Sequence, residues 1–354
     1  MIARHPWYPQ VDPELAELVR AEGLTLMGVA AADDAPGPEA EYEQWIASGR
    51  HGSMDYLARH AGLKYRPSAL VPGCRSILFV AINYYQRAPE WRPGTGRVAR
   101  YAWGRDYHKE LGKRLKRIAR RLGERYPGET FRAFTDATPL AERHYAEQAG
   151  IAFTGRHTLL INGELGSWFV VGEILSTREW RPSEPAAGRH GACPSRCRRC
   201  LDVCPTGALE APHRINASRC ISYLTIEHDG IIDEELRPLM GEWIFGCDLC
   251  QEVCPLNVRA QETGVENFRR AIAGSQLDLA RVLAIRDDRE FTEMFAGSPL
   301  MRARRRRLVR NACIAAANTD RHELLPQLRA RAADADEIIA HHARWAVKRL
   351  QDPV

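Results

Sequence analysis

The chain reads Cys193-Pro-Ser-Arg-Cys197-Arg-Arg-Cys200-Leu-Asp-Val-Cys204-Pro205 and, after an isolated Cys220, Cys247-Asp-Leu-Cys250-Gln-Glu-Val-Cys254-Pro255. This stretch, residues 193–254, holds eight of the ten cysteines. Eight thiolates suffice for two 4Fe–4S clusters, and two Cys-x2-Cys-x3-Cys-Pro runs are the pattern that binds such a pair. The stretch therefore predicts a small domain built around two iron–sulfur clusters.

The predicted ligand sets cross between the two runs, because the last cysteine of each run in such domains binds the cluster of the other run. The first cluster is assigned to Cys193, Cys197, Cys200 and Cys254. The second cluster is assigned to Cys204, Cys220, Cys247 and Cys250. Three residues rather than two separate Cys193 from Cys197, so Cys193 is the ligand that the pattern defines least.

Two other chemistries use cysteines at short spacings. Zinc knots contain Cys-x2-Cys pairs, but proline directly after the last cysteine of both runs favours iron–sulfur binding. Disulfides are typical of exported proteins, and the N-terminal residues lack the apolar core of a signal peptide. The spacing therefore favours the two-cluster interpretation.

The whole sequence predicts a water-soluble protein of two or three domains. Its 354 residues, 45% of them hydrophobic, suffice for a sizeable core, and the net charge of +5 is modest. No apolar run approaches membrane-spanning length, and cysteine-ligated clusters suit a reducing compartment. We therefore expect a cytoplasmic monomer without a membrane segment.

The residues before the cysteines alternate between strand and helix patterns, which predicts an α/β domain over residues 1–180. Apolar, β-rich runs predict strands at 24–30, 76–84, 130–135 and 167–175. Helical periodicity is clearest at 109–125, where apolar residues share one face and basic residues the other. Neither a Walker A loop nor a Gly-x-Gly-x-x-Gly turn after a strand is present, so a Rossmann dinucleotide site has no support.

The cluster domain is predicted over residues 181–265 and an α-helical region over 266–354. Paired helices at 308–318, 323–332 and 337–350 suggest a partial HEAT-like repeat. A basic block precedes them, formed by Arg302, Arg304, Arg305, Arg306, Arg307 and Arg310. Such a block indicates either a nucleic-acid partner or a solvated helix face, and the sequence leaves both open.

Several longer phrases resemble the epoxyqueuosine reductase family, and the likeness runs from about residue 52 to residue 318. Ferredoxins in general lack these phrases. They are Arg100-Tyr-Ala-Trp-Gly-Arg-Asp-Tyr-His-Lys109, Asp136-Ala-Thr-Pro-Leu-Ala-Glu-Arg143, Thr154-Gly-Arg-His-Thr-Leu-Leu-Ile-Asn162, Arg219-Cys-Ile-Ser-Tyr-Leu-Thr-Ile-Glu227 and Glu235-Leu-Arg-Pro-Leu-Met-Gly241. One departure is Phe153-Thr-Gly-Arg156, where the family often has Trp-Thr-Gly-Lys; it keeps both the aromatic ring and the positive charge.

The resemblance implies reduction of epoxyqueuosine to queuosine at the wobble position of tRNA, the last step of queuosine synthesis. It implies cobalamin in a nitroreductase-like α/β domain, a ferredoxin-like domain whose two 4Fe–4S clusters supply electrons, and HEAT-like C-terminal helices that hold the tRNA. An external flavodoxin- or ferredoxin-like protein would be the electron donor. By the same resemblance Asp136 is the proton donor, and the residues at the cobalamin are Arg59, Asp136, Arg156, Ser167 and Ser222.

Asp136 has two candidate roles on chemical grounds. It ends a predicted strand, where α/β folds commonly present reactive groups, and a carboxylic acid can protonate a departing oxygen. An apolar cofactor nearby would raise the pKa of Asp136 by desolvation. The alternative is a cap for a helix starting near residue 138, and the resemblance favours the acid. His108 nearly matches a cobalt-binding motif with one residue too many, so we expect it beside the site rather than on cobalt.

Two other functions share part of this pattern. A reductive dehalogenase also combines cobalamin with two clusters, but such proteins usually carry an export signal and need no Arg-rich helical region. A two-cluster electron-transfer protein would not need about 190 residues before its first cysteine. Cobalamin binding separates the electron carrier from both enzymes, and tRNA binding separates the two enzymes.

Overall fold

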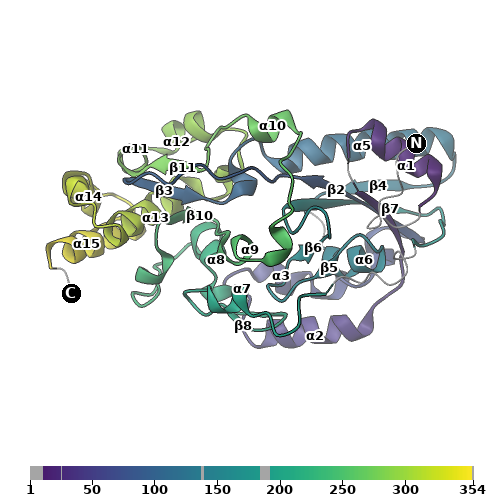
Figure 1. The fold of residues 1–354 in the computed structure, drawn as a ribbon, viewed down its shortest axis with the longest axis horizontal. Helices are drawn as coiled ribbons and strands as arrows, with labels where there is room; N and C mark the ends of the chain where they lie inside the picture. The colour runs from purple at the N-terminus through teal and green to yellow at the C-terminus, as the bar shows by residue number, and fades with distance from the viewer. Residues whose placement is uncertain (1–10, 25, 137–138, 184–191, 353–354) are drawn as a thin grey trace.

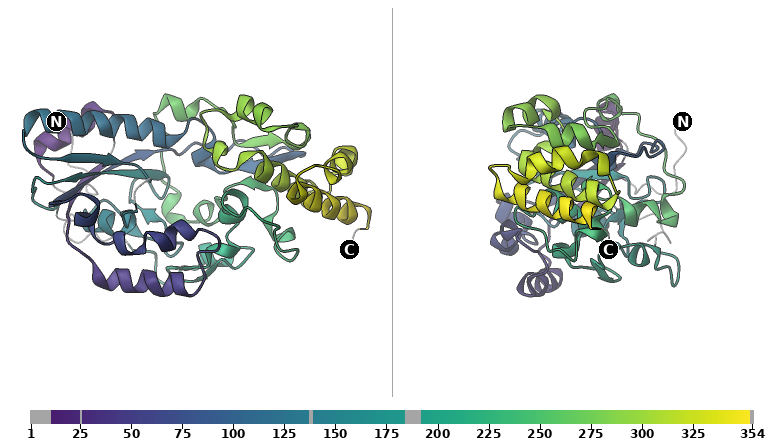
Figure 2. Two further views of the ribbon diagram at one scale, coloured as in Figure 1. Left: turned by 180° about the vertical axis from the view of Figure 1, so that it is seen from behind. Right: turned by 90° about the vertical axis from the view of Figure 1, so that its left-hand side faces the viewer.

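The computed structural model describes residues 11–24, 26–136, 139–183 and 192–352. A four-stranded sheet lies toward one end of the elongated molecule and a group of C-terminal helices toward the other (Figures 1 and 2). The cysteine-bearing segment lies between these ends. No helix in the described ranges is long and apolar enough to cross a membrane.

The larger sheet has the strand order β1-β2-β7-β4, and all neighbouring strands are antiparallel. Its strands are β1 (Leu26–Ala31), β2 (Ser76–Asn83), β7 (Phe169–Ser176) and β4 (Phe131–Phe134). The four predicted strands are therefore present, and the predicted mixed α/β composition is confirmed. The antiparallel order shows that the alternation of strands and helices along the chain does not build parallel βαβ units here.

Strand β2 is apolar throughout because helices cover both faces of the sheet. Its residues at even positions pack against α5 (Tyr107–Arg125), through Leu111, Leu115, Ile118 and Leu122. Its residues at odd positions pack with Tyr145 and Ala146 of α6 (Glu142–Gln148). Side chains of a strand alternate between faces, so burial on both faces requires an unbroken apolar run.

A second, three-stranded sheet joins segments that are far apart in the sequence. Strand β3 (Thr95–Val98) lies between β10 (Trp243–Phe245), which is parallel to it, and β11 (Gln276–Asp278), which is antiparallel. These three strands come from the three sequence ranges predicted as separate domains. The division at residues 180 and 265 therefore stays a prediction, with hydrogen-bonded strands crossing both boundaries.

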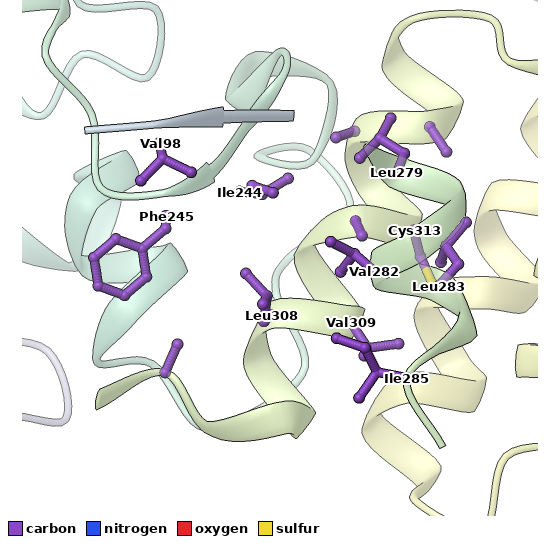
Figure 3. Close-up of a cluster of buried hydrophobic side chains, with 14 of the residues drawn as sticks. Val98, Ile244, Phe245, Leu279, Val282, Leu283, Ile285, Leu308, Val309 and Cys313 are labelled. Carbon is purple, nitrogen blue, oxygen red and sulfur yellow. The ribbon is translucent and has the colours of Figure 1, made fainter. Parts of the chain in front are cut away.

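The C-terminal helices pack around α13 (Arg304–Asn318) with α14 (Leu325–Ala332) and α15 (Glu337–Gln351). Residues 308–317 are all buried, and small side chains in this run allow the neighbouring helices to approach closely. Cys313 is fully buried here, as expected for a small core residue. Figure 3 shows that this core continues to Val98 of β3 and Phe245 of β10.

The cysteine-bearing segment contains three short helices and a β-hairpin. The helices are α7 (Arg199–Asp202), α8 (Ile221–Ile226) and α9 (Leu249–Glu252), and the hairpin joins β8 (Leu209–Ala211) to β9 (Arg214–Ile215). Helices α7 and α9 contact one another, and each carries a cysteine, Cys200 or Cys250, as its second residue. The two runs thus fold alike and face each other.

Candidate active site

One cavity, of about 380 Å³, lies between the larger sheet and the cysteine-bearing segment. Its wall includes Asp136 and Glu142, the β7 residues Val170 and Val171, and four cysteines. Those cysteines are Cys204, Cys220, Cys247 and Cys250. A larger hollow of about 840 Å³ lies near Arg259 and is lined by none of the predicted site residues. The smaller cavity is therefore the candidate active site.

The first predicted cysteine group lies together in the fold. Burial, with the nearby thiols of Cys193 and Cys254, raises the pKa of Cys200. Burial, with the nearby thiols of Cys193 and Cys197, raises the pKa of Cys254. The extra residue before Cys197 is accommodated by Arg196, whose φ of 61° is left-handed. The longer gap therefore leaves Cys193 beside the other three predicted ligands.

The second predicted group also lies together, next to the first. Burial, with the nearby thiols of Cys220 and Cys250, raises the pKa of Cys247. Burial also raises the pKa of Cys250, beside the thiols of Cys220, Cys204 and Cys200. No group of three His, Cys, Asp or Glu residues in the described ranges is spaced to hold a single metal ion. A cubane spreads its ligands more widely than a zinc knot, since each thiolate binds a different iron.

Arg100 hydrogen-bonds to the second cysteine run and makes a cation–π contact with Trp168. Its backbone N–H donates to Asp248 Oδ2 at 2.8 Å, and its Nη1 donates to Asp248 at 3.2 Å and to Glu252 at 2.8 Å. Its guanidinium also lies 4.6 Å from the centre of the Trp168 ring. Burial raises the pKa of Asp248 to about 6 despite Arg100. The Arg100 phrase and the cysteine run next to Asp248 therefore form one buried polar network.

Two of the predicted cobalamin residues besides Asp136 line the cavity, and two do not. Ser167 and Ser222 are in the wall, although the Ser167 hydroxyl already accepts hydrogen bonds from the side-chain amides of Gln251 at 3.0 Å and Asn257 at 2.9 Å. Arg156 lies instead against the first cysteine run, where its N–H donates to Cys193 Sγ at 3.4 Å and its Nη1 to the Cys197 carbonyl. Arg59, the last residue of α3 (Asp55–Arg59), is exposed.

Asp136 faces the cavity from a strained backbone position. Its φ is 51°, and 53% of its side chain is exposed. The Tyr107 hydroxyl donates to Asp136 Oδ2 at 2.6 Å, and His108 Nε2 lies 3.5 Å from the same oxygen. His108 Nδ1 lies 2.7 Å from Asp106 Oδ1, so the imidazole bridges two carboxylates. His108 thus lies beside the site, as the sequence predicts.

These contacts decide where the protons sit. Burial lowers the pKa of His108, but hydrogen bonds to Asp106 and Asp136 outweigh it and raise the value to about 9. Burial raises the pKa of Asp136, but hydrogen bonds from His108 and Tyr107 outweigh that and leave it below its usual value. The expectation that an apolar cofactor beside Asp136 raises its pKa stays a prediction. The proton of the pair lies on His108 near neutral pH.

The capping role of Asp136 is also wrong. Helix α6 begins at Glu142, six residues further on, and no side chain caps its N-terminus. The Asp136 carboxylate contacts Tyr107 and His108 instead, while the Asp136 N–H donates to Glu142 Oε1 at 3.1 Å. Residues 137 and 138 lie outside the described residues. Among the described residues Asp136 therefore lines the cavity and caps no helix.

Sequence reasoning missed two carboxyl groups next to Asp136. Glu142 lines the cavity, and Glu173 of β7 is fully buried. Burial and the neighbouring carboxylate of Asp136 raise the pKa of Glu142 to about 8. Burial, with Glu142 and Asp136 nearby, raises the pKa of Glu173 well above its usual value. The available signals were the place of Glu142 in the 136–143 phrase and the charged Glu173 inside the predicted strand 167–175.

The basic block is largely paired within the protein. Its ion pairs are Arg302–Glu227 at 2.5 Å, Arg305–Asp334 at 2.6 Å, Arg306–Asp336 at 2.5 Å and Arg307–Asp229 at 3.0 Å. Arg310 is fully buried and donates to the carbonyls of His228 and Gly230. Neither a simple polyanion site nor a solvated face describes this block. Arg304 is exposed and is without an ion-pair partner among the described residues.

Two protein-family models match the chain. A 4Fe-4S double cluster binding domain matches residues 193–257, and the epoxyqueuosine reductase QueG (DUF1730) model matches residues 64–137. The first range contains the seven cysteines of the two runs and Cys220 between them. The second ends next to Asp136 and contains the Arg100 phrase. The iron–sulfur interpretation is thereby confirmed at the level of the domain.

The chain is similar to known epoxyqueuosine reductases over nearly its whole length. It is 39% identical to the one from Alicycliphilus denitrificans, over 96% of this chain and 98% of that protein, and 36% identical to the one from Escherichia coli, over 94% and 89%. A crystal structure of an epoxyqueuosine reductase with an epoxyqueuosine-modified tRNA-Tyr stem loop superposes with a TM-score of 0.89 at 28% identity, over 96% of this chain and 90% of that one.

A Bacillus subtilis epoxyqueuosine reductase, solved with a catalytic aspartate loop swung out of its active site, has a TM-score of 0.87 at 28% identity, over 96% of this chain and 90% of that one. The fold agrees with these two solved structures over nearly all of the chain. Identity above 30% over nearly all of both chains decides the family. This chain belongs to the epoxyqueuosine reductase family.

Proposed function

We propose that this protein reduces epoxyqueuosine in tRNA to queuosine, by bringing electrons from two 4Fe–4S clusters and a proton from Asp136 to one cavity. The observation that carries the proposal is the cavity wall. It combines Asp136 with Cys204, Cys220, Cys247 and Cys250, the proposed ligands of the second cluster. A proton source and an electron source at the same space are what reductive removal of an oxygen atom requires.

The cavity fits part of a large, mainly apolar ring such as the corrin of cobalamin. Apolar side chains of Leu159, Val170, Val171 and Ile221 form much of its wall. His157 also lines it, and His157 Nδ1 accepts the Leu159 N–H at 3.2 Å, so the proton is on Nε2. That Nε2–H is buried and unpartnered among the described residues. An amide oxygen of a corrin side chain would satisfy it.

Cobalamin, when bound, supplies a metal centre that accepts electrons one at a time and is strongly reducing in its low-valent state. The protein's own groups bind the clusters, orient Asp136 and deliver the proton. The cysteines hold the clusters, with an external flavodoxin- or ferredoxin-like donor as the source of electrons. Tyr107 and His108 orient the Asp136 carboxyl through hydrogen bonds. Asp136 delivers a proton to the departing oxygen, which avoids a bare alkoxide.

Asp136 can donate a proton only while its carboxyl group is protonated, so its pKa limits this role. With the cavity open to water, Asp136 is ionised and His108 carries the proton. An apolar ring over Asp136 removes water from its exposed side and raises its pKa, which moves the shared proton toward the carboxylate. The proposal therefore requires cofactor binding to protonate Asp136.

The function is tested by anaerobic conversion of epoxyqueuosine-containing tRNA with a chemical reductant. We expect queuosine to form only when both clusters and cobalamin are present. A change in the visible spectrum of cobalamin on adding the protein separates the proposal from a plain electron carrier. Dehalogenation of a halogenated aromatic without tRNA conversion would favour the reductive dehalogenase alternative, which the family relationship does not favour.

The basic block gives a sharper test of tRNA binding. Arg304 is exposed and available for a phosphate, whereas Arg305 is held by Asp334. Arg304→Gln is expected to weaken tRNA binding and to reduce the log–log salt slope by about 1, the value of one lost phosphate contact. Arg305→Gln is the matched comparison, and we expect lower thermal stability from it because Asp334 loses a partner. An unchanged salt slope for Arg304→Gln would remove Arg304 from the interface.

A further inference from the structure

Glu173 is an unusual residue for the middle of a central strand. It lies on β7, pairs with Phe79 of β2 and Phe134 of β4, and is 0% exposed. Neither of its carboxylate oxygens has a hydrogen-bond partner in the described ranges when it is ionised. Burying an unpaired charge is costly, so this carboxyl is retained in the neutral form or shares a proton with a neighbour.

The neighbour is Glu142. Glu173 and the cavity-lining Val171 are two positions apart and therefore share a face of β7, the face on which α6 packs. Glu142 is the first residue of α6, and its carboxyl is the charged group that acts most strongly on Glu173. Glu142 also accepts the Asp136 N–H at 3.1 Å. Glu142 thus contacts the Asp136 backbone, and its side chain lines the same cavity as Asp136.

The charged groups around Glu142 and Glu173 differ from those around Asp136. Lys64 and Arg143 are the cations near Glu142, and burial outweighs them, so its pKa is about 8. His108, Tyr107 and Arg302 act on Asp136 and keep its pKa low. Within the described residues, the charged groups that act on Glu173 are Glu142 and Asp136, and both are acidic. Glu173 and Glu142 are therefore protonated at neutral pH, whereas Asp136 is ionised.

The proposed reaction needs more than one proton. Converting an epoxide to an alkene breaks two carbon–oxygen bonds, forms one carbon–carbon π bond and releases the oxygen as water. The balance requires two electrons, supplied by the external donor, and two protons. Asp136 can deliver one proton per ionisation and must then be reprotonated. His108 can supply the first of these protons to Asp136, and a second proton source next to Asp136 would complete the reaction without admitting bulk water.

We propose that Glu142 and Glu173 form a buried proton store that reprotonates Asp136, with Glu142 passing its proton outward and Glu173 refilling Glu142. This inference rests on the proposed function, because it assigns the second proton of that reaction. Glu142 and Glu173 act through Asp136, to which they supply protons, and are positioning residues rather than catalytic ones. After each turnover the store is refilled from solvent by way of the cavity.

Infrared spectroscopy tests the store without any turnover. In cluster-loaded protein without cobalamin or tRNA, we expect carboxylic-acid carbonyl bands from Glu142 and Glu173 at neutral pH, with the Glu142 band lost as the pH passes through about 8. Glu142→Gln and Glu173→Gln should each remove one of these bands. Glu147→Gln is the matched control, because Glu147 lies on the same helix and accepts the Thr154 N–H away from the cavity. Absence of these bands from the wild-type protein would overturn the proposal.

Kinetics supply the second measurement. Glu142→Gln should lower the single-turnover rate by about 10²-fold, the lower end of what a lost proton-transfer group produces. The wild-type rate should fall as pH rises through about 8, because the protonated store is the active form, and this limb should disappear in Glu142→Gln. A normal rate and pH profile in folded Glu142→Gln and Glu173→Gln would refute the store. A wild-type protein unable to convert the tRNA would refute the proposed function instead, whatever the infrared result.

Discussion

Asp136→Asn is expected to lower single-turnover conversion of epoxyqueuosine-tRNA by about 10² to 10⁴, the range that general acid catalysis contributes. Asparagine keeps the size of the side chain and can still accept the Tyr107 hydrogen bond, which is 2.6 Å long in the native protein. It cannot donate an acidic proton. Excess chemical reductant removes electron supply as the limiting step, so the measured loss reports on proton delivery.

Asp320→Asn is the matched control for this prediction. Asp320 has a φ of 52°, close to the 51° of Asp136, and lies after α13 outside the cavity wall. Asparagine and aspartate both tolerate this left-handed conformation, so backbone strain changes little in either variant. Near-normal turnover by Asp136→Asn, with clusters and cobalamin bound, would transfer the acid role to His108 or Tyr107.

The second large effect is expected from the crossed cysteine assignment. The wild-type protein should contain about eight irons, four in each of two clusters, and Cys254→Ser should lose the cluster of the first run. Iron content should then fall to about four, and conversion of tRNA should stop because the electron path is broken. Iron analysis and low-temperature electron paramagnetic resonance of the reduced protein measure both clusters.

Double variants decide whether the runs exchange their last cysteines. Cys200→Ser with Cys254→Ser removes two ligands of one proposed cluster and should leave about four irons. Cys250→Ser with Cys254→Ser removes one ligand from each and should leave almost none. If each run instead kept its own last cysteine, the second pair would retain a cluster. Cys74→Ala is the control, since Cys74 is buried in the core beneath α6 and is not part of the cavity wall.

Local patterns in the sequence determined the cluster domain, the four strands of the larger sheet and the helices predicted at 109–125, 308–318, 323–332 and 337–350, within a few residues of their observed ends. Ligand spacing and hydrophobic periodicity are properties of short segments, and they keep their meaning whatever the rest of the chain does. Strand β2 is an example, because an apolar run of that length is stable only between two covering layers. Asp136 was identified as a candidate acid from the family phrase at 136–143. Its chemistry alone left the capping role open.

Only the tertiary structure decided which groups those segments bring together. Arg305 and Arg307 were indistinguishable from Arg304 in the sequence, yet acidic residues distant in the chain pair with the first two. The proton on His108 rather than Asp136 follows from contacts among α5, β4 and their surroundings. Glu173 meets Glu142 across the sheet face, and its protonation depends on burial and neighbouring charge. The energies of burial and of charge–charge interaction depend on distances between groups in space. Short segments of sequence do not encode those distances.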